Sequence, residues 1–323
     1  MKRIASRITS VLAALLVTGS VFAQAYPSRP LRMVIPWPPG QATDLVGRVM
    51  AEKLSQIFGQ PVVPDNKPGA GGMIGTDFAA KAPPDGYTLL AGSSGPVTIN
   101  PLLQKTAYDP ERDLIAVAKV GVSPYLLVTN PAFPAANIRE FLALVRANPD
   151  KYTFASSGTG ATAHLIAEYF NSMAGLKATH VPYKGSAPAL ADVVGGQVHY
   201  MIETVAATMP LVRSGRLKAF GVSLQKGSAL APGIEPLALT ANIPGFDVGA
   251  WLGLMVPAGT PKPVVDRLAA AMDSAMHGSD MRERLSSVGL EVDYRRAEEF
   301  AVELKEQRAR FADIIQKGNI RLD

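Results

Sequence analysis

The stretch SSGTGATAHL, Ser156–Leu165, contains the residue types best suited to chemistry in this sequence. Gly158, Gly160 and Ala163 have the G-x-G-x-x-A spacing of loops that seat a phosphate group on the first turn of a helix. Anions bind there because free backbone N–H groups and the positive end of the helix dipole meet. The spacing therefore indicates an anion site, although an ordinary strand-to-helix turn capped by Ser or Thr has the same composition.

A nucleotide is not the anion that we expect. A dinucleotide site places an acidic residue about 20 residues beyond the glycines, where it binds a ribose hydroxyl. This sequence has no Asp or Glu between Asn171 and Ala191, and it contains no G-x-x-x-x-G-K-[ST] motif. A smaller anion is the better prediction.

Other short loops follow predicted strands in the same way. Leu31–Ile35 leads into PWPPGQ at residues 36–41, Tyr87–Ala91 leads into GSSGP, and Val198–Ile202 leads into Glu203. Loops at the carboxyl ends of strands gather at one edge of an open α/β sheet, where ligands bind. We therefore expect these loops to share one cleft, although a surface turn is the alternative interpretation of Glu203.

The sequence lacks the common motifs of catalysis. It has no G-x-S-x-G elbow and no H-E-x-x-H, and SLQK at residues 223–226 lacks the partner motifs of S-x-x-K enzymes. There is no cysteine, and the four histidines show no metal-ligand spacing. Among the histidines, His164 is the candidate for a role at the site, because it lies one turn into the helix after SSGTGA. We expect no enzyme activity, no metal and no cofactor, with an exported hydrolase as a remote alternative.

Short β-rich runs alternate with amphipathic helical patterns, which predicts an α/β fold of mainly parallel sheets flanked by helices. One helix is expected from Thr43 to the stop at Gly59, and another from about Ala161 to Met173. Two extended stretches marked by Pro and Gly, residues 126–134 and 245–261, are expected to carry the chain between two lobes.

The N-terminus predicts export. Met1–Ala25 has Lys2, Arg3 and Arg7 before an apolar stretch and an A-x-A cleavage signal, so Tyr26 is the expected mature N-terminus. No later stretch approaches the roughly 20 apolar residues of a transmembrane helix. The formal charge of +5 becomes +2 once those three basic residues leave. The remaining basic residues form no runs with interleaved aromatic residues, so we expect no nucleic-acid partner.

The mature chain resembles, over nearly its whole length, the periplasmic receptors of tripartite tricarboxylate transporters, the Bug (Bordetella uptake gene) family. The matching motifs are YPSRPLRMVIPWPPG, PVVPDNKPGAGGMIG, PPDGYTLLAGSSG, FASSGTGATAHL, HVPYKGSAPAL, GGQVHYMIE and WLGLMVPAGTP. The resemblance implies a two-lobed, type II-like periplasmic binding protein that closes over a small carboxylate. We expect residues 1–25 to be a cleaved signal peptide, residues 26–127 and 251–323 to form lobe 1, and residues 128–250 to form lobe 2.

The resemblance also implies which residues bind the ligand. In that family the loop after the first strand holds one carboxylate group, largely through backbone amides and ordered water, and the SSGTGA-type loop approaches from the other lobe. By position, the expected ligand-binding residues are Trp37, Pro38, Pro39, Gly40, Gln41, Asp44, Ser93, Ser94, Ser156, Ser157, Thr159, Gly160, Ala161, His164 and Glu203.

Two features depart from the family pattern. The first loop usually resembles PFPAGG, so Trp37 and Gln41 replace a Phe and a Gly. Because Gln reaches positive φ less easily than Gly, the resemblance leaves two expectations open: an altered backbone cradle, or an amide side chain in place of a water molecule. Glu203 stands where the family commonly has an Asp near the distal end of the ligand. A carboxylate there repels a second ligand carboxylate unless it is protonated or separated by a donor. The expected ligand is a mono- or dicarboxylate with a hydroxyl, amine or aromatic body rather than a tricarboxylate.

The resemblance thus implies a periplasmic, monomeric, non-enzymatic receptor that passes a small organic carboxylate to integral-membrane transporter subunits. An alternative of another class is a sensor accessory that presents the ligand to a signalling protein. The residues themselves leave uptake and sensing open.

Overall fold

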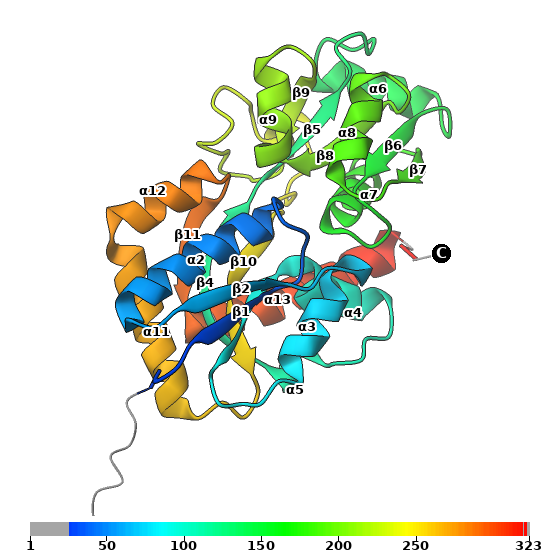
Figure 1. The fold of residues 1–323 in the computed structure, drawn as a ribbon. Helices are drawn as coiled ribbons and strands as arrows, with labels where there is room; N and C mark the ends of the chain where they lie inside the picture. Colours follow the sequence, from blue (N-terminus) through cyan, green and yellow to red (C-terminus); the bar gives the residue numbers. More distant parts are fainter. Residues whose placement is uncertain (1–25, 319, 322–323) are drawn as a thin grey trace, which may run out of the picture.

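The computed structural model describes residues 26–318, 320 and 321, so the signal peptide predicted for residues 1–25 lies outside the described residues. The described chain forms two α/β halves, each built on one sheet (Figure 1). The first sheet has the strand order β11-β4-β10-β3-β1-β2 and the second has the order β7-β6-β8-β5-β9. The strands are β1 (Leu31–Ile35), β2 (Val62–Asn66), β3 (Thr88–Ser93), β4 (Leu114–Ser123), β5 (Tyr125–Thr129), β6 (Thr153–Ser156), β7 (Thr179–Pro182), β8 (Tyr200–Thr204), β9 (Lys218–Val222), β10 (Ala250–Pro257) and β11 (Glu291–Arg296).

Helices cover both faces of each sheet. The first sheet packs against α2 (Ala42–Phe58), α11 (Lys262–His277) and α12 (Ser279–Ser287) on one face, and against α3 (Met73–Ala80), η2 (Gly95–Ile99) and α13 (Ala297–Gly318) on the other. The second packs against α6 (Ile138–Ala147) and α7 (Thr162–Ala174) on one face, and against α8 (Ser186–Val194) and α9 (Val205–Arg213) on the other. The short elements are η1 (Ala70–Gly72), α4 (Asn100–Leu103), α5 (Pro110–Asp113) and α10 (Leu237–Thr240).

The strands are apolar on both faces because each face is covered. In β5, Tyr125 and Leu127 join the core beneath α6 and α7, while Leu126 and Val128 join the core beneath α8 and α9. This division follows from the two-residue period of a strand, which points successive side chains to opposite faces. It also explains why this strand reads as a continuous apolar run.

The sheets are mixed, which corrects the prediction of mainly parallel sheets. Parallel pairing joins β1 to β2 and β3, and β6 to β7 and β8. Antiparallel pairing joins β10 to β3 and β4, β11 to β4, and β5 to β8 and β9. The physical reason is that the segments leading from one half to the other are themselves strands. They pair along the sheets and run against the strands of the β-α-β units.

The described chain passes between the sheets at two places. Pro124 alone separates β4 of the first sheet from β5 of the second, and the segment between β9 and β10 brings the chain back. The lobe boundaries expected from the sequence, after residue 127 and after residue 250, fall within β5 and at the first residue of β10. The division into lobes at those positions remains a prediction.

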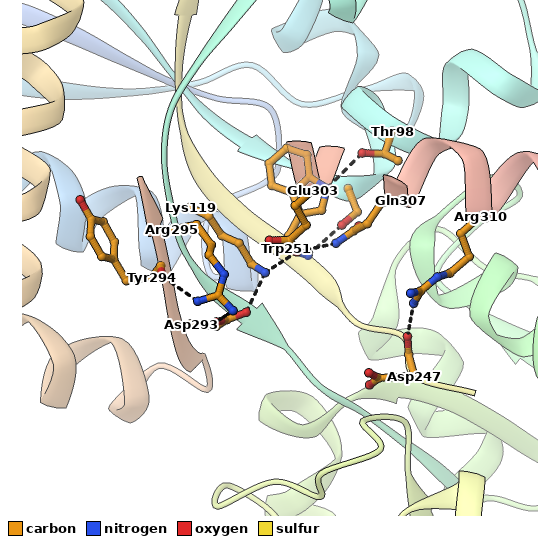
Figure 2. Close-up of polar contacts among 11 residues, drawn as sticks. Thr98, Lys119, Asp247, Trp251, Asp293, Tyr294, Arg295, Glu303, Gln307 and Arg310 are labelled. Carbon is orange, nitrogen blue, oxygen red and sulfur yellow. Dashed lines mark hydrogen bonds and ion pairs between the residues drawn. The ribbon is translucent and has the colours of Figure 1, made fainter. Parts of the chain in front are cut away.

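Helix α13 packs on the first half and also contacts the second, and Figure 2 shows its polar contacts. Lys119 of β4 has only 2% of its side chain exposed, and its Nζ donates hydrogen bonds to Asp293 of β11 at 2.8 Å and to Glu303 of α13 at 2.5 Å. Further along the helix, Arg310 donates to the main-chain carbonyl of Asp247 on the returning segment. Phe311 packs in a cluster that includes Leu165 of α7.

Replacing Lys119 by Ala is expected to lower the free energy of unfolding by about 3 kcal/mol, because Asp293 and Glu303 lose a buried cation. Urea unfolding measures the change. In the matched control Lys262→Ala, the lost ion pair with Asp266 is exposed, so a change of less than about 1 kcal/mol is expected. Equal effects of the two substitutions would contradict the structural role assigned to Lys119.

Candidate functional site

A cavity of about 670 Å³ lies between the two halves. Of the residues expected to bind ligand, nine line it: Trp37, Pro38, Pro39, Gly40, Gln41, Ser93, Ser157, Ala161 and Glu203. A wider hollow of about 1120 Å³ lies on the outside, beside β2 and α3. There Arg29, Arg32 and Lys81 already pair with acidic neighbours. The basic side chains that line this outer hollow are therefore not free to bind an anion.

Four helices of the described chain begin at this cavity. Residues at the N-terminal ends of α2, α7, α8 and α9 line it, and none of these described helix starts has a side-chain cap. Away from the cavity, α6 begins at Asn137, whose side chain accepts a hydrogen bond from the Glu140 N–H, while α3, α11 and α12 begin without a side-chain cap and do not converge on this cavity. Uncapped first turns leave backbone N–H groups free and present the positive ends of helix dipoles. The cavity therefore suits an anion from both sides.

The first wall is the loop between β1 and α2. Trp37 Nε1 donates to Ser93 Oγ at 3.0 Å, and the Gly40 N–H donates to Asp44 Oδ2 at 2.8 Å. Gly40 has a φ of +86°, which suits glycine. Gln41 has a φ of −79°, so the replacement of the family's second glycine imposes no left-handed backbone here. Gln41 lines the cavity, so the alternative in which its amide side chain takes the place of a water molecule remains a prediction.

Asp44 lies behind this loop and does not line the cavity. Its side chain is 2% exposed and accepts hydrogen bonds from Arg48 Nε at 2.9 Å and Asn66 Nδ2 at 2.7 Å, besides the one from Gly40. Burial opposes its ionisation, but these hydrogen bonds outweigh burial and lower the pKa of the carboxyl. Asp44 thus holds the loop in place as an anion.

The second wall is the loop between β6 and α7. Ser157 and Ala161 line the cavity, but Ser156, Thr159, Gly160 and His164 do not. Thr159 is exposed to solvent, while Ser156 is fully buried with its Oγ 2.7 Å from His180 Nε2. Because Ser156 is buried and does not line the cavity, a molecule held in the cavity does not reach it, which argues against the hydrolase alternative at this Ser–His pair.

Two stacked histidines support this loop from beneath. The rings of His164 and His180 lie 3.9 Å apart between centroids, and the Gly160 N–H donates to His164 Nδ1 at 3.2 Å. That hydrogen bond requires an unprotonated Nδ1. Burial, together with the charge that His164 would carry, lowers the pKa of His180 to about 3. The neutral His180 imidazole and the Nδ1 acceptor of His164 therefore support the loop at neutral pH.

Ser94, also expected at the site, lies outside the cavity because it serves the sheet. Its Oγ accepts a hydrogen bond from the Trp251 N–H at 2.8 Å. Ser93 is the last residue of β3 and turns its side chain towards the cavity, whereas Ser94 already has the helical backbone that leads into η2.

Glu203 lines the cavity although only 3% of it is exposed. Its Oε1 accepts from the Thr204 N–H and its Oε2 accepts from Ser186 Oγ, each at 2.8 Å. Burial raises the pKa of this carboxyl, and the hydrogen bonds from Thr204 and Ser186 oppose that rise. Burial and the neighbouring Glu203 also raise the pKa of Tyr125, so its phenol is a neutral hydrogen-bonding group.

Several lining residues were missed from the sequence: Ser123, Tyr125, Thr162, Lys184 and Ser186. Lys184 is the one basic side chain among the described residues that line the cavity, and it is exposed. It follows β7, so the rule that loops after strands meet at one edge could have included it. Ser123 and Tyr125 lie on the passage between the halves and give no such signal.

The described residues contain no group of three histidine or acidic side chains placed to hold a metal ion. Within the same part of the chain, no helix combines the length and apolar character needed to cross a membrane.

Comparison with known proteins gives the following relations. The model of the family described as "Tripartite tricarboxylate transporter family receptor" matches residues 46–320. The chain is similar to the periplasmic binding protein BugD, with 34% identity, a TM-score of 0.81, and coverage of 92% of this chain and 99% of BugD. It is also similar to Rpa4515 of R. palustris with adipate, at 29% identity, a TM-score of 0.84 and coverage of 92% and 99%. For MatC of Rhodopseudomonas palustris with bound malate, the values are 34%, 0.79, 90% and 100%. These relations confirm the two-sheet α/β binding-protein fold expected from the sequence.

The lowered pKa of His180 predicts that the free energy of unfolding depends on pH. An unfolded chain protonates this histidine below about pH 6.5, whereas the folded chain excludes the proton down to about pH 3. The unfolded state then binds more protons, so stability falls as the pH decreases through this window. His180→Asn is expected to make the fall between pH 7 and 5 shallower, as measured by urea unfolding at each pH.

The wild-type profile measured over the same pH range provides the reference. A His180→Asn profile as steep as that of the wild type would show that this histidine does not bias folding.

Proposed function

Because this chain belongs to the tripartite tricarboxylate transporter receptor family, as its motifs predicted, we propose that it captures a small organic carboxylate between its two halves and delivers it to a membrane transporter. Members of this family are periplasmic solute-binding receptors, and the chain is a binding protein rather than an enzyme. The finer parts of the proposal are the ligand class, its binding residues and the membrane partner.

The single observation that carries the carboxylate proposal is the convergence of four uncapped helix starts on one cavity. The starts come from both halves: α2 from the first, and α7, α8 and α9 from the second. An anion that accepts hydrogen bonds from both halves at once binds best when they are close together. Such a ligand shifts the equilibrium towards the closed form through its differential affinity.

The ligand is proposed to be a mono- or dicarboxylate with a hydroxyl, amine or aromatic body. Two similar proteins hold the dicarboxylates adipate and malate, and a cavity of about 670 Å³ has room for acids of that size. Lys184 offers a cation for a second carboxylate. The Ser186 hydroxyl and Thr204 N–H cover the oxygens of Glu203. Burial also disfavours the charged form of Glu203, which reduces its repulsion of an acid.

The proposed setting is the periplasm, reached by means of the signal peptide at residues 1–25. The proposed partners are integral-membrane transporter subunits that bind the loaded receptor transiently, and the receptor acts as a monomer. No nucleic acid is involved, in keeping with the scattered basic residues of the sequence.

A thermal-shift screen of organic acids, with the matching amides as neutral controls, tests the carboxylate proposal. An acid that binds the folded form raises the melting temperature in proportion to ln(1 + [L]/Kd), and the amide is expected to leave it unchanged. The anion site would be refuted if no acid raised the melting temperature. It would also be refuted if the amides raised the melting temperature as much as the acids.

The helix-start mechanism is tested by Ala207→Asp and Ala207→Asn. Ala207 lies in the first turn of α9 and lines the cavity, so an Asp there favours the helix through its dipole but repels a bound anion. We expect Ala207→Asp to weaken binding of the best acid at least tenfold by calorimetry, while the similarly sized Ala207→Asn loses far less. Equal losses would assign the effect to size rather than to charge.

A further inference from the structure

The floor of the cavity is a row of residues across three strands of the first sheet. Ser93 of β3 lies opposite Leu252 of β10, and Ala250 of β10 lies opposite Ser123 of β4. All four line the cavity. Because neighbouring strands are about 4.8 Å apart, and Ala250 and Leu252 are about 6.6 Å apart along β10, the two serines at the ends of this staggered row are separated by roughly 12 Å. The floor is thus an apolar strip of Ala and Leu with a hydroxyl at each end.

The two hydroxyls differ in their partners. Ser93 Oγ accepts the hydrogen bond from Trp37 Nε1, which fixes it beside the first wall. Ser123 is 1% exposed, and its Oγ has no hydrogen-bond partner among the described residues. Neighbouring buried serines are satisfied: Ser94 Oγ accepts from the Trp251 N–H, and Ser223 Oγ accepts from the Tyr125 N–H.

An unpaired buried hydroxyl is costly, and native proteins satisfy nearly all such groups. Ser123 is the last residue of β4, one residue before the passage to the second half, and it lines the cavity. It therefore lies where a ligand that is enclosed by both halves would touch the floor. The hydroxyl has the position and the unused hydrogen-bonding capacity of a recognition group.

We propose that Ser123 Oγ hydrogen-bonds a hydroxyl or oxo substituent on the carbon skeleton of the ligand, so that the receptor prefers a substituted carboxylate to its unsubstituted analogue. This inference rests on the proposed carboxylate-binding function. The ligand's carboxylates belong at the helix starts and at Lys184, which are the positively polarised parts of the lining. Ser123 has the neighbours Ala250 and Tyr125 instead, which suit a neutral oxygen on a carbon chain.

Calorimetry with matched acids tests the proposal. The probes are succinate with malate and adipate with 2-hydroxyadipate, since each pair differs by one hydroxyl. Wild type is expected to bind the hydroxy acid of a pair more tightly, and Ser123→Ala is expected to reduce that preference about tenfold, the worth of one well-formed hydrogen bond. Affinity for the unsubstituted acid is expected to change less than twofold.

The melting temperature of the unliganded protein provides the second readout. Ser123→Ala removes a hydroxyl that lacks a partner, so the variant is expected to melt at the wild-type temperature or above it. The control Ser287→Ala alters an exposed serine that bonds the Arg284 carbonyl, and its affinity for every acid is expected to match wild type. A Ser123→Ala protein that melts lower and loses both acids of a pair equally would make Ser123 a structural residue and overturn the proposal.

Two outcomes distinguish a failure of the proposed carboxylate binding from a failure of the role of Ser123. If none of the four acids or a wider acid panel binds the wild type, the carboxylate receptor itself is wrong. If acids bind but the ratio within each pair is the same in wild type and in Ser123→Ala, the receptor stands and the role of Ser123 is refuted.

Discussion

The arrangement of the whole molecule depends on leaving the first turns of four helices without side-chain partners at one place. Asn137 satisfies such a turn at the start of α6, whereas α3, α11 and α12 also begin without a side-chain cap but away from the cavity. At the cavity, the residues at the helix boundaries are Gln41, Ala161, Gly185 and Thr204, and none of these described residues caps its helix through a side chain. Unused donors are unfavourable when they lose water without a partner. The strands place these four helix starts around one cavity, so their backbone N–H donors can share one anionic acceptor.

Much of the rigidity required for this comes from residues behind the cavity. Asp44 fixes the Gly40 amide, and the two stacked histidines fix the loop that contains Gly160. Held in this way, the donors need little reorganisation when a ligand arrives, which preserves affinity. These residues therefore shape the walls of the cavity although they do not line it. Sequence position placed Asp44 and His164 among the ligand contacts, whereas the structure places them one layer further out.

Local patterns predicted most of the elements. The strand at Leu31–Ile35 has the bounds expected, and α2 ends at Gly59 in the left-handed conformation that a stop glycine adopts. Loops after strands predicted the first wall because their position follows from the direction of parallel strands. The passage between the halves was placed too late, at residues 126–134. A single proline separates β4 from β5, and both strands are apolar, so no loop composition marks the change. Ser123 escaped notice for the same reason, since its importance comes only from the pairing of β4 with β10.

The two halves also meet beside the cavity, where the backbone of Gly289, between α12 and β11, lies against Ala206 at the start of α9. A Cβ atom at position 289 would lie 2.5 Å from the Ala206 Cβ. Contact this close leaves no slack between the halves, so even one added methyl group would act as a wedge at the rim. Because Gly289 also has a φ of +85°, which favours glycine, position 289 sets how closely the two halves approach at the rim without being part of the cavity lining.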